Sequence, residues 1–587
     1  MRWLRTRQEF WLGLLGAVLA FGVCEAVSRA GLVRRSYLPP ASEVLARAFE
    51  LAGDSVFLDG IGVTLRAWAL GLGLACAIAV PLGLLLGSVP LVDAAARTIV
   101  ELLRPLPSVA LIPLVSLLLG SGTETEVALI AYASVWPILF NTVYGLGEAD
   151  PLAKDTLRAF GFGRLTVLLR AELPATAPFI AAGIRISAAV ALILAVATEI
   201  LSGFGEGLGI FIAQAGPGDG RHEGRPCGCG VGGGPGARHQ RRAGVGRATP
   251  VPLDTGTPGG RRRRARGDPM SGAGEEGVWA PLSEGETYRS RSLPSPLEHQ
   301  SPDSQCPQSP QSPESPQSPK APARRLRTTT PHPALLRWLV LVLAVGVWEV
   351  AARARDSVYF PAPDRIARHM HELWFDGPVR HLFLSPAALD DILPSLGRMG
   401  AGFALAAVAG VVLGVVVGRS RWAYALANPV LQFARAVPPP ALVPVFVVIF
   451  AFGTPMQIAS IAFSAVWPVL INTAAGVRNT DPLRLDVAAV LRLNTAERLW
   501  FLVLPSALPR VFAGLRLSLS LSLILMVFSE LLPGTANGIG FTLTEAQTRS
   551  DLLTVWAALV LLGALGHLLN TGLLAVEKRL LGKGRAT

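Results

Sequence analysis

The sequence predicts an all-α membrane protein with several membrane-spanning helices, built from two tandem copies of one domain. Hydrophobic residues make up 51% of the 587 residues and charged residues only 16%, with a mean hydropathy of +0.45. A soluble chain carries charge on about a quarter of its residues, so this composition disfavours a soluble catalytic protein. Long apolar runs and an internal repeat support the same prediction.

The apolar runs are each close to the ~20 residues that a helix needs to cross the hydrocarbon core. In the first half they lie near 10–28, 61–87, 98–120, 125–147 and 177–203. In the second half they lie near 334–352, 395–418, 424–452, 456–477, 508–532 and 552–577. Five spans are therefore predicted before the middle of the chain and six after it. The first run follows three arginines and lacks a small-residue cleavage site, which favours an anchor over a signal peptide.

The two halves repeat one another at a constant offset without gaps. Pro174 and Pro505 differ by 331 positions, and the same offset pairs Trp136 with Trp467. Further pairs are Pro107 with Pro438, Pro113 with Pro444, Asn141 with Asn472, Asp150 with Asp481, Gly183 with Gly514, Arg185 with Arg516, and Glu199 with Glu530. Both copies run in the same direction, so the pattern predicts a tandem duplication, unlike the inverted repeats of many secondary transporters.

Between the halves, the chain changes to Gly, Arg, Pro and Ser without hydrophobic periodicity. Residues 221–270 contain eleven Arg against three acids, a net +8 of the formal +12 of the whole chain. The Ser-Pro-Gln stretch 292–323 is low-complexity sequence, which predicts disorder. Cys227 and Cys229 have no partner pair or His cluster at zinc spacing, so we predict no metal site.

A hydrophilic loop of about 30 residues follows the fourth predicted span of each half. In the first half it runs from Glu148 to Ala177, and in the second it ends at Leu504-Pro505. This length exceeds what a membrane turn needs, and its arginines place the loop on the cytoplasmic side. We therefore expect it to meet a partner there, although a charge-balanced, solvated surface helix is the alternative.

In this loop the sequence resembles the permease subunits of binding-protein-dependent ABC importers, most closely the nitrate, sulfonate and taurine branch. That family has an acid and alanines, a Gly six positions after the acid, and an apolar residue, Leu and Pro ten, twelve and thirteen positions after the Gly. The first copy matches with Asp155, Gly161, Ala171, Leu173 and Pro174. The second copy matches with Asp486, Ala488, Ala489, Leu502, Leu504 and Pro505. Arg492 stands where the family has Gly, and since Gly alone reaches positive φ at little cost, we expect a different turn there.

The resemblance implies that this chain couples to ATP hydrolysis without catalysing it. In the family, the loop forms a coupling helix that docks on a separate ATP-hydrolysing subunit, and closure of two such subunits rocks the membrane helices. This sequence contains no Gly-x-x-x-x-Gly-Lys-Ser/Thr loop, and its only Gly-Lys is Gly582-Lys583. The implied partners are two copies of an ABC ATP-binding subunit, an extracytoplasmic substrate-binding protein and the lipid bilayer. No cofactor and no nucleic-acid partner are expected.

Several residues inside the apolar runs are candidates for the translocation pathway or for helix interfaces. Glu199 and Glu530 lie near the ends of the fifth spans, where a carboxylate is costly; either a pathway or interface role or an interfacial cap explains them. Arg185 and Arg516 are expected to extend to the cytoplasmic surface. Prolines of the third spans are expected to kink them, which is common in pathway helices: Pro105, Pro107, Pro113, Pro438, Pro439, Pro440 and Pro444.

The predicted topology contains a conflict. The counterpart of the sixth span, 331 positions earlier, falls on Arg, Gly, Pro and His, which cannot form a lipid-spanning helix. Five crossings would invert the second half and place its loop opposite the ATPase. We hypothesise a reading-frame error, motivated by the lost span and the lysine-free, Arg-rich composition. GC-rich codons for residues 237–250, with freely chosen third bases, can be read one base on as Leu-Ala-Ile-Asn-Ala-Ala-Leu-Ala-Trp-Val-Glu-Arg-Arg-Leu, which aligns with 570–580. The rival is a genuine linker that binds anionic lipid or nucleic acid.

The sequence thus predicts a first permease domain over 1–216, a linker over 217–333 and a second permease domain over 334–587. The predicted location is the inner membrane, with a cytoplasmic N-terminus. Resemblance to the branch suggests a small anion, such as a sulfonate, nitrate or taurine, or a vitamin precursor. The alternatives are an ion-coupled secondary transporter or channel, and a membrane anchor or scaffold.

Overall fold

The computed structural model describes residues 2–35, 37–89, 106–120, 122–203, 206–215 and 333–582. Every regular element within these ranges is a helix, which confirms the all-α prediction. The helices of both halves belong to one compact unit. The predicted linker 217–333, apart from its last residue, and the proposed shifted frame over 237–250 lie outside the described residues.

The described part of the first half contains seven helices of eight or more residues and several short ones. They are α1 (Arg2–Arg29), α2 (Ala41–Leu51), α3 (Ser55–Ser88), η1 (Ser108–Leu111), α5 (Ile112–Leu119), α6 (Thr123–Gly147), α7 (Pro151–Ala159), α8 (Arg164–Val167), η2 (Leu168–Glu172), α9 (Leu173–Ser202) and α10 (Leu208–Gln214). Part of the predicted span 98–120 lies outside the described residues, and the rest forms η1 and α5.

The described elements of the second half follow a similar order and end with a long helix that has no counterpart among the described elements of the first half. Its elements are α11 (Pro333–Arg355), α12 (Pro363–Met370), η3 (His371–Phe375), η4 (Val379–His381), α13 (Pro386–Arg419), α14 (Arg421–Ala436), α15 (Pro439–Phe450), α16 (Thr454–Arg478), α17 (Pro482–Val490), α18 (Thr495–Arg498), η5 (Leu499–Val503), α19 (Leu504–Leu531), α20 (Ile539–Thr548) and α21 (Leu552–Gly582).

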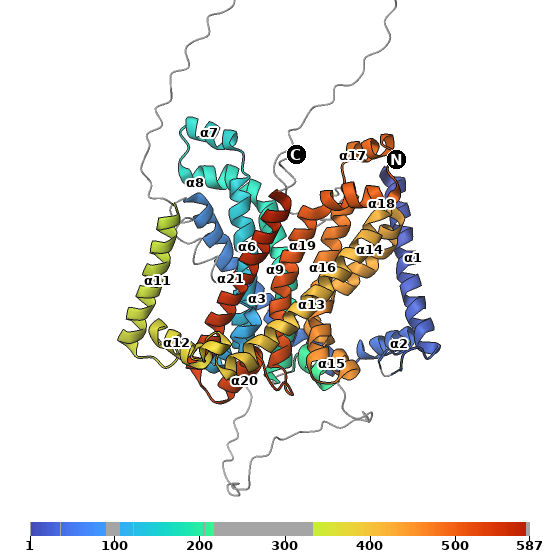
Figure 1. Ribbon diagram of the computed structural model, residues 1–587. Coiled ribbons are helices and arrows are strands. Elements are labelled where there is room, and N and C mark those ends of the chain that lie inside the picture. Colours follow the sequence, from blue (N-terminus) through green and yellow to red (C-terminus); the bar gives the residue numbers. More distant parts are fainter. Residues whose placement is uncertain are drawn as a thin grey trace, which may run out of the picture. The chain divides into compact units, whose positions relative to one another are not determined.

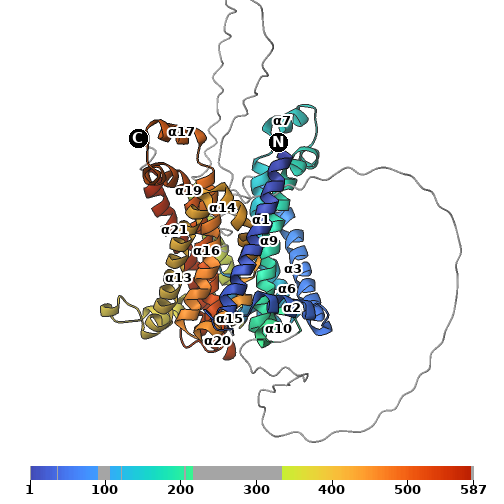
Figure 2. The ribbon, with the colours of Figure 1, turned by 90° about the vertical axis from the view of Figure 1, so that its right-hand side faces the viewer.

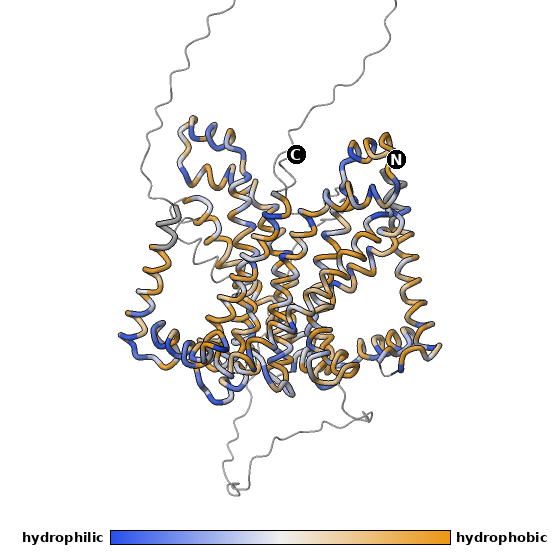
Figure 3. Tube along the Cα trace, in the orientation of Figure 1, coloured by the Kyte–Doolittle hydropathy of each residue, from blue (hydrophilic) through white to orange (hydrophobic). Residues whose placement is uncertain are grey.

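The described helices include eight that are long and apolar enough to cross a membrane, or nine if a bent pair forms one span. That pair is α14 and α15, which meet at an angle of 91°. Pro438 immediately precedes α15 and cannot continue the helix of α14, because proline lacks the backbone donor. The span predicted at 424–452 is therefore broken sharply at the expected prolines. Figure 3 shows apolar residues along the long helices and hydrophilic residues gathered at their ends.

Each half is built around three long helices that pack through small residues. In the first half α6 packs between α3 and α9, and in the second α16 packs between α13 and α19. A Cβ added at Gly71 would lie 2.5 Å from Ile130, and one added at the equivalent Gly402 would lie 2.6 Å from Ile461. Glycine at these positions allows the close backbone approach that is typical of membrane helices.

The first helix of each half is tied to the short helix that follows it by the same contact. Glu25 accepts a hydrogen bond from the backbone N–H of Ser42 at 2.9 Å. Glu349 accepts one from the backbone N–H of Asp364 at 3.1 Å. Both glutamates thus accept from a backbone donor in the first turn of α2 or α12.

The two halves exchange contacts in a reciprocal way. Helix α1 of the first half packs along α14 of the second, where a Cβ at Gly13 would lie 2.8 Å from Pro429. Helices η1 and α5 contact α19 and α20, and their counterpart α15 contacts α9 and α10. Two views at right angles show α7 and α17 at the same end of the helices (Figures 1 and 2).

Candidate functional site

The predicted loop of each half forms a short exposed helix that stands out from the long ones (Figure 1). Helix α7 begins after Asp150, whose carboxylate accepts from the backbone N–H of Leu152 at 2.9 Å. Helix α17 begins in the same way after Asp481, which accepts from Leu483 at 2.9 Å. In both helices Asp followed by Pro supplies an N-cap and a residue preset for the first turn, so the sequence itself starts these helices.

A left-handed residue ends each of these short helices. Gly161 has φ +82° and Arg492, at the same position of the second copy, has φ +53°. The hydrogen bonds around them also match, because Gly161 N bonds to Arg158 O and Arg492 N bonds to Ala489 O. The expectation of a different turn at Arg492 is therefore wrong: the second copy makes the same turn with a less favourable residue.

Large apolar side chains point to solvent from both short helices and from the turns after them. Leu152 is 73% exposed and Phe160 is 76% exposed in the first half. The equivalent Leu483 is 68% exposed and Leu491 is 64% exposed. Apolar side chains repeated at matching positions on two otherwise hydrophilic loops are typical of a surface that docks a partner.

Polar contacts hold each loop to the long helices behind it. The Lys154 ammonium lies 3.4 Å from the carboxylate of Glu172 and donates to Leu146 O at 3.2 Å. In the second half, Arg484 of α17 donates to the Ser506 hydroxyl of α19 at 3.3 Å. Within the loop, Arg498 donates to Leu485 O at 3.1 Å. These contacts connect α7 to α6 and to the residue before α9, and α17 to the first turn of α19.

The loop residues predicted from the sequence occupy matching places. Asp155 and Asp486 lie exposed on α7 and α17, and Asp155 forms an ion pair with Arg158 at 3.3 Å. Of the two alanines on α17, Ala488 is buried and Ala489 is exposed. Behind the turns, Leu173 and Leu504 begin α9 and α19, with the following prolines in the first turn: Pro174 and Pro505. Half-buried Ala171 and Leu502 lie in the short π-helical segments just before them.

At the opposite end of the long helices, each half holds a buried glutamate in a set of contacts that we call the glutamate clasp. In the first half Glu199 accepts from the Thr64 hydroxyl at 2.7 Å and from Gly209 N at 2.6 Å, while Leu208 N donates to Thr64. The clasp joins α3, α9 and α10. Glu199 is only 4% exposed.

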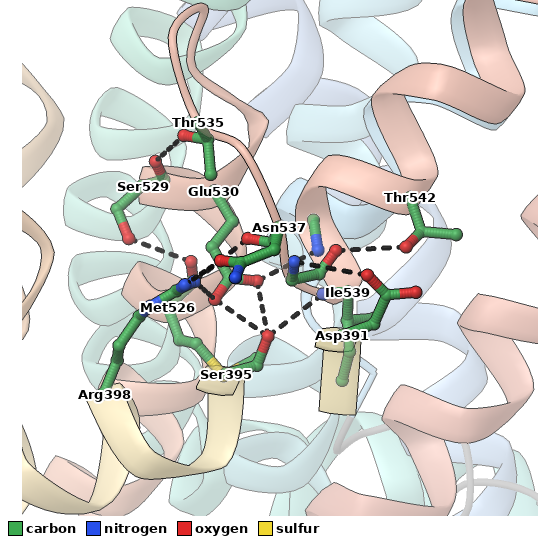
Figure 4. A network of polar contacts seen from close by, with 12 residues as sticks. Asp391, Ser395, Arg398, Met526, Ser529, Glu530, Thr535, Asn537, Ile539 and Thr542 are labelled. Carbon is green, nitrogen blue, oxygen red and sulfur yellow. Dashed lines mark hydrogen bonds and ion pairs between the residues drawn. The ribbon is translucent and has the colours of Figure 1, made fainter. Parts of the chain in front are cut away.

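The second clasp repeats the first, residue for residue. Glu530 accepts from the Ser395 hydroxyl at 2.8 Å and from Gly540 N at 3.0 Å, while Ile539 N donates to Ser395 (Figure 4). A Cβ at Gly538 would lie 2.6 Å from the Glu530 carboxylate, so the turn before α20 accepts no side chain there. Both glutamates predicted near the ends of the fifth spans therefore lie between helices.

The two clasps differ in how their charge is balanced. Arg398 donates to Glu530 at 2.7 Å and also contacts Asn537 (Figure 4). The equivalent position in the first half is Ala67, which is fully buried. There, Glu126 lies against Glu199 and its Oε1 has no hydrogen-bond partner among the described residues, whereas the second half has Gln457 at that place. One half thus holds an ion pair and the other a pair of carboxyl groups.

Sequence reasoning missed the partners of these glutamates. The run from 395 was treated as apolar, although Arg398 within it is a charge that needs a partner. The repeat would have paired Thr64 with Ser395 as equivalent hydroxyls. Arg398 could not be found that way because its counterpart is alanine.

The predicted prolines lie where the halves meet. Pro107 and Pro113 are buried at the starts of η1 and α5, and Pro438 precedes α15, which contains Pro444. Both elements contact the other half. Their role in a pathway remains a prediction.

These features define a polytopic membrane protein with paired loops at one end of its helices. The family model "Binding-protein-dependent transport system inner membrane component" matches residues 79–219 and 408–582, together more than half of the chain. The chain belongs to this family, twice over in tandem. It is therefore a multi-pass inner-membrane permease of bacterial ABC importers and not an enzyme.

Individual relatives transport small anions according to their names. The chain is 37% identical over 193 residues to the bicarbonate transport system permease protein CmpB of Synechococcus elongatus, covering 32% of this chain and 69% of that protein. It is 31% identical to the nitrate import permease protein NrtB of Leptolyngbya laminosa (40% of this chain, 83% of the relative). It is 32% identical to the putative aliphatic sulfonates transport permease protein SsuC of Bacillus subtilis (41% and 85%).

Proposed function

We propose that this chain forms the translocation pathway of an ATP-driven importer for a small anion and is driven through α7 and α17 by separate ATP-binding subunits. The observation that carries the proposal is the pair of exposed apolar positions on these helices, at matching places in two copies. Two equivalent docking surfaces fit two copies of one ATPase, each taking one loop.

The contacts behind the loops explain how force would reach the membrane. Helix α7 is ion-paired through Lys154 to Glu172, the residue before α9, and α17 is hydrogen-bonded through Arg484 to Ser506 in the first turn of α19. When the ATPases approach one another on binding ATP, the loops move with them and α9 and α19 rotate. The substrate path would then open alternately at its two ends. An extracytoplasmic binding protein would deliver the substrate at the end opposite the loops.

The docking proposal is tested by placing charge on the apolar surface. Phe160→Asp and Leu491→Asp are each expected to weaken co-purification with the ATPase and to lower ATP-dependent uptake at least tenfold, because a charged side chain is desolvated on docking. Val358→Asp is the control, since Val358 is 76% exposed in the segment between α11 and α12, away from the loops. Equal loss of ATPase binding in all three variants would contradict the assignment.

The competing functions give different results. Uptake that persists after deletion of the ATPase gene would indicate an ion-coupled transporter or channel. Uptake unchanged by substitution of both Asp155 and Asp486 would indicate a scaffold.

The substrate class is proposed from the relatives' names. Uptake of labelled nitrate, bicarbonate, taurine and an alkanesulfonate into cells that contain the full transporter would identify it. Transport of an uncharged vitamin precursor in place of all four anions would contradict the small-anion proposal.

A further inference from the structure

Helix α21 closes the second half through contacts with three other elements of that half. It packs on α12, α19 and α20. The Thr554 hydroxyl bonds to the His369 ring of α12 at 2.8 Å. Near the other end of α21, the Glu577 carboxylate pairs with Arg516 of α19 at 2.5 Å. These contacts define the seat of a sixth membrane helix.

Among the described residues, no helix covers the equivalent surface of the first half. Helices α2 and α12 align with an offset of 322, since Ser42 and Asp364 make the same contact with Glu25 and Glu349. This offset pairs Ile366, which is 2% exposed, with Val44, which is 51% exposed.

The same difference appears across the contact between halves. Helix α21 also packs on α5, where Leu114 is 5% exposed. The counterpart of Leu114 on α15 is Val445, which is 43% exposed. Ile366 on α12 and Leu114 on α5 are thus buried. Their counterparts, Val44 on α2 and Val445 on α15, are exposed at the corresponding place beside the first half. We call this place, with Val44, Arg185 and Val445, the sixth-helix seat.

A charge marks the seat most clearly. Arg516 is balanced by Glu577, but its counterpart Arg185 is exposed and has no ion pair among the described residues. Arg185 lies within the candidate membrane span Arg164–Ser202, so its guanidinium reaches the membrane surface only by extending along α9, and an acid beside it would balance its charge. The occupant of the seat should therefore carry an acid at the level of Glu577.

The ends of the described chain also require another crossing. Helix α10 lies at the start of α3, through Leu208 and Thr64, at the end opposite α7. Helix α11 ends beside α12 at that same outer end, so it begins at the α17 end. The polypeptide must therefore cross from one end to the other an odd number of times between α10 and α11.

We propose that the sixth-helix seat is filled by a membrane helix equivalent to α21, encoded by the codons of residues 237–250 read one base further on. That reading can supply Val-Glu at the position of Val576-Glu577 and so places an acid opposite Arg185. The acid appears in this reading only if the codon of Arg247 ends in A, and the genomic DNA sequence shows directly whether it does. This proposal concerns helix packing and does not depend on the ATPase assignment.

The first test is the genomic DNA across codons 205–335, together with the intact masses of the native proteins in purified membranes. The expected result is a one-base difference that restores an apolar span with its acid and ends the first protein before the second domain. An intact frame, with a single chain of 61.9 kDa, would overturn the proposal.

The second test locates the restored helix. The restored first half, co-expressed with the second half and with Cys24 and Cys76 replaced by serine, receives cysteines at Arg185 and at the restored acid. A short bifunctional thiol reagent should cross-link them as efficiently as the control pair Arg516→Cys with Glu577→Cys. Cross-linking of the control pair alone would overturn the seat, as would a product with twice the mass, which indicates a second copy there.

Discussion

Replacement of Arg398 by alanine tests whether the second glutamate clasp depends on charge balance. Arg398 is 7% exposed and Glu530 is fully buried, so solvent screens their 2.7 Å ion pair very little. Removing one partner of a buried pair costs about 3–5 kcal/mol, because the remaining charge is left without compensation. With about 2.1 cal/mol/K of unfolding entropy per residue, a chain of 587 residues loses roughly 0.8 °C in Tm per kcal/mol, so a fall of about 2–4 °C is expected.

The assay is thermal unfolding of the purified protein in detergent, followed by near-UV circular dichroism. Arg398→Ala combined with Glu530→Gln should recover much of the loss, since a neutral amide can still accept from Ser395 and Gly540. Arg549→Ala is the matched control, because Arg549 is 72% exposed in its ion pair with Glu545. A Tm for Arg398→Ala within about 1 °C of the parent, or a double variant no more stable than the single one, would refute the reasoning.

Four other changes follow from features described above or from neighbouring contacts. Arg492→Gly should raise the free energy of unfolding by about 1 kcal/mol, because a left-handed φ costs a non-Gly residue roughly that much. Gly161→Ala should lower the free energy of unfolding by a similar amount, and chemical denaturation measures both changes. Glu126→Gln, which copies Gln457 of the other half, should raise Tm because a neutral amide avoids the cost of burying a second carboxylate beside Glu199, and a lower Tm would contradict this. Burial tends to raise the pKa of Asp551, but its hydrogen bonds from Thr554 and the nearby His369 outweigh this and leave the pKa below its usual value. The ionised Asp551 carboxylate therefore stabilises the fold at pH values above the ordinary pKa of aspartate, and this stabilisation is lost as pH falls through the lowered pKa. Asp551→Asn should flatten the fall in Tm that is measured between about pH 5 and 3.

The long helices and the repeat could be predicted because they depend on features that single residues carry. Apolar length favours a membrane span, and an Asp-Pro pair supplies an N-cap and a first-turn residue, as it does at the starts of α7 and α17. The tandem offset then placed Glu199 and Glu530 at equivalent positions before any contact was known.

Other features depend on partners that are distant in the sequence. Arg398 and Glu530 are 132 positions apart, and no local pattern joins them. The angle of 91° between α14 and α15 depends on the prolines, which interrupt the helix, and on contacts of α15 with α9 and α10 of the other half. The turn at Arg492 shows that surrounding hydrogen bonds can impose a conformation that the residue itself disfavours.

The packing of α1 along α14 determines the order in which the molecule can be completed. Helix α1 is synthesised first, but its partner Pro429 emerges more than 400 residues later. Until then, the glycine-lined face of α1 at Gly13 and Gly16 is covered only by lipid. If the halves are made as separate proteins, a first half without its partner keeps that face open, and membrane quality control could recognise it as an orphan subunit. The same contact that joins the halves would then keep their amounts equal in the cell.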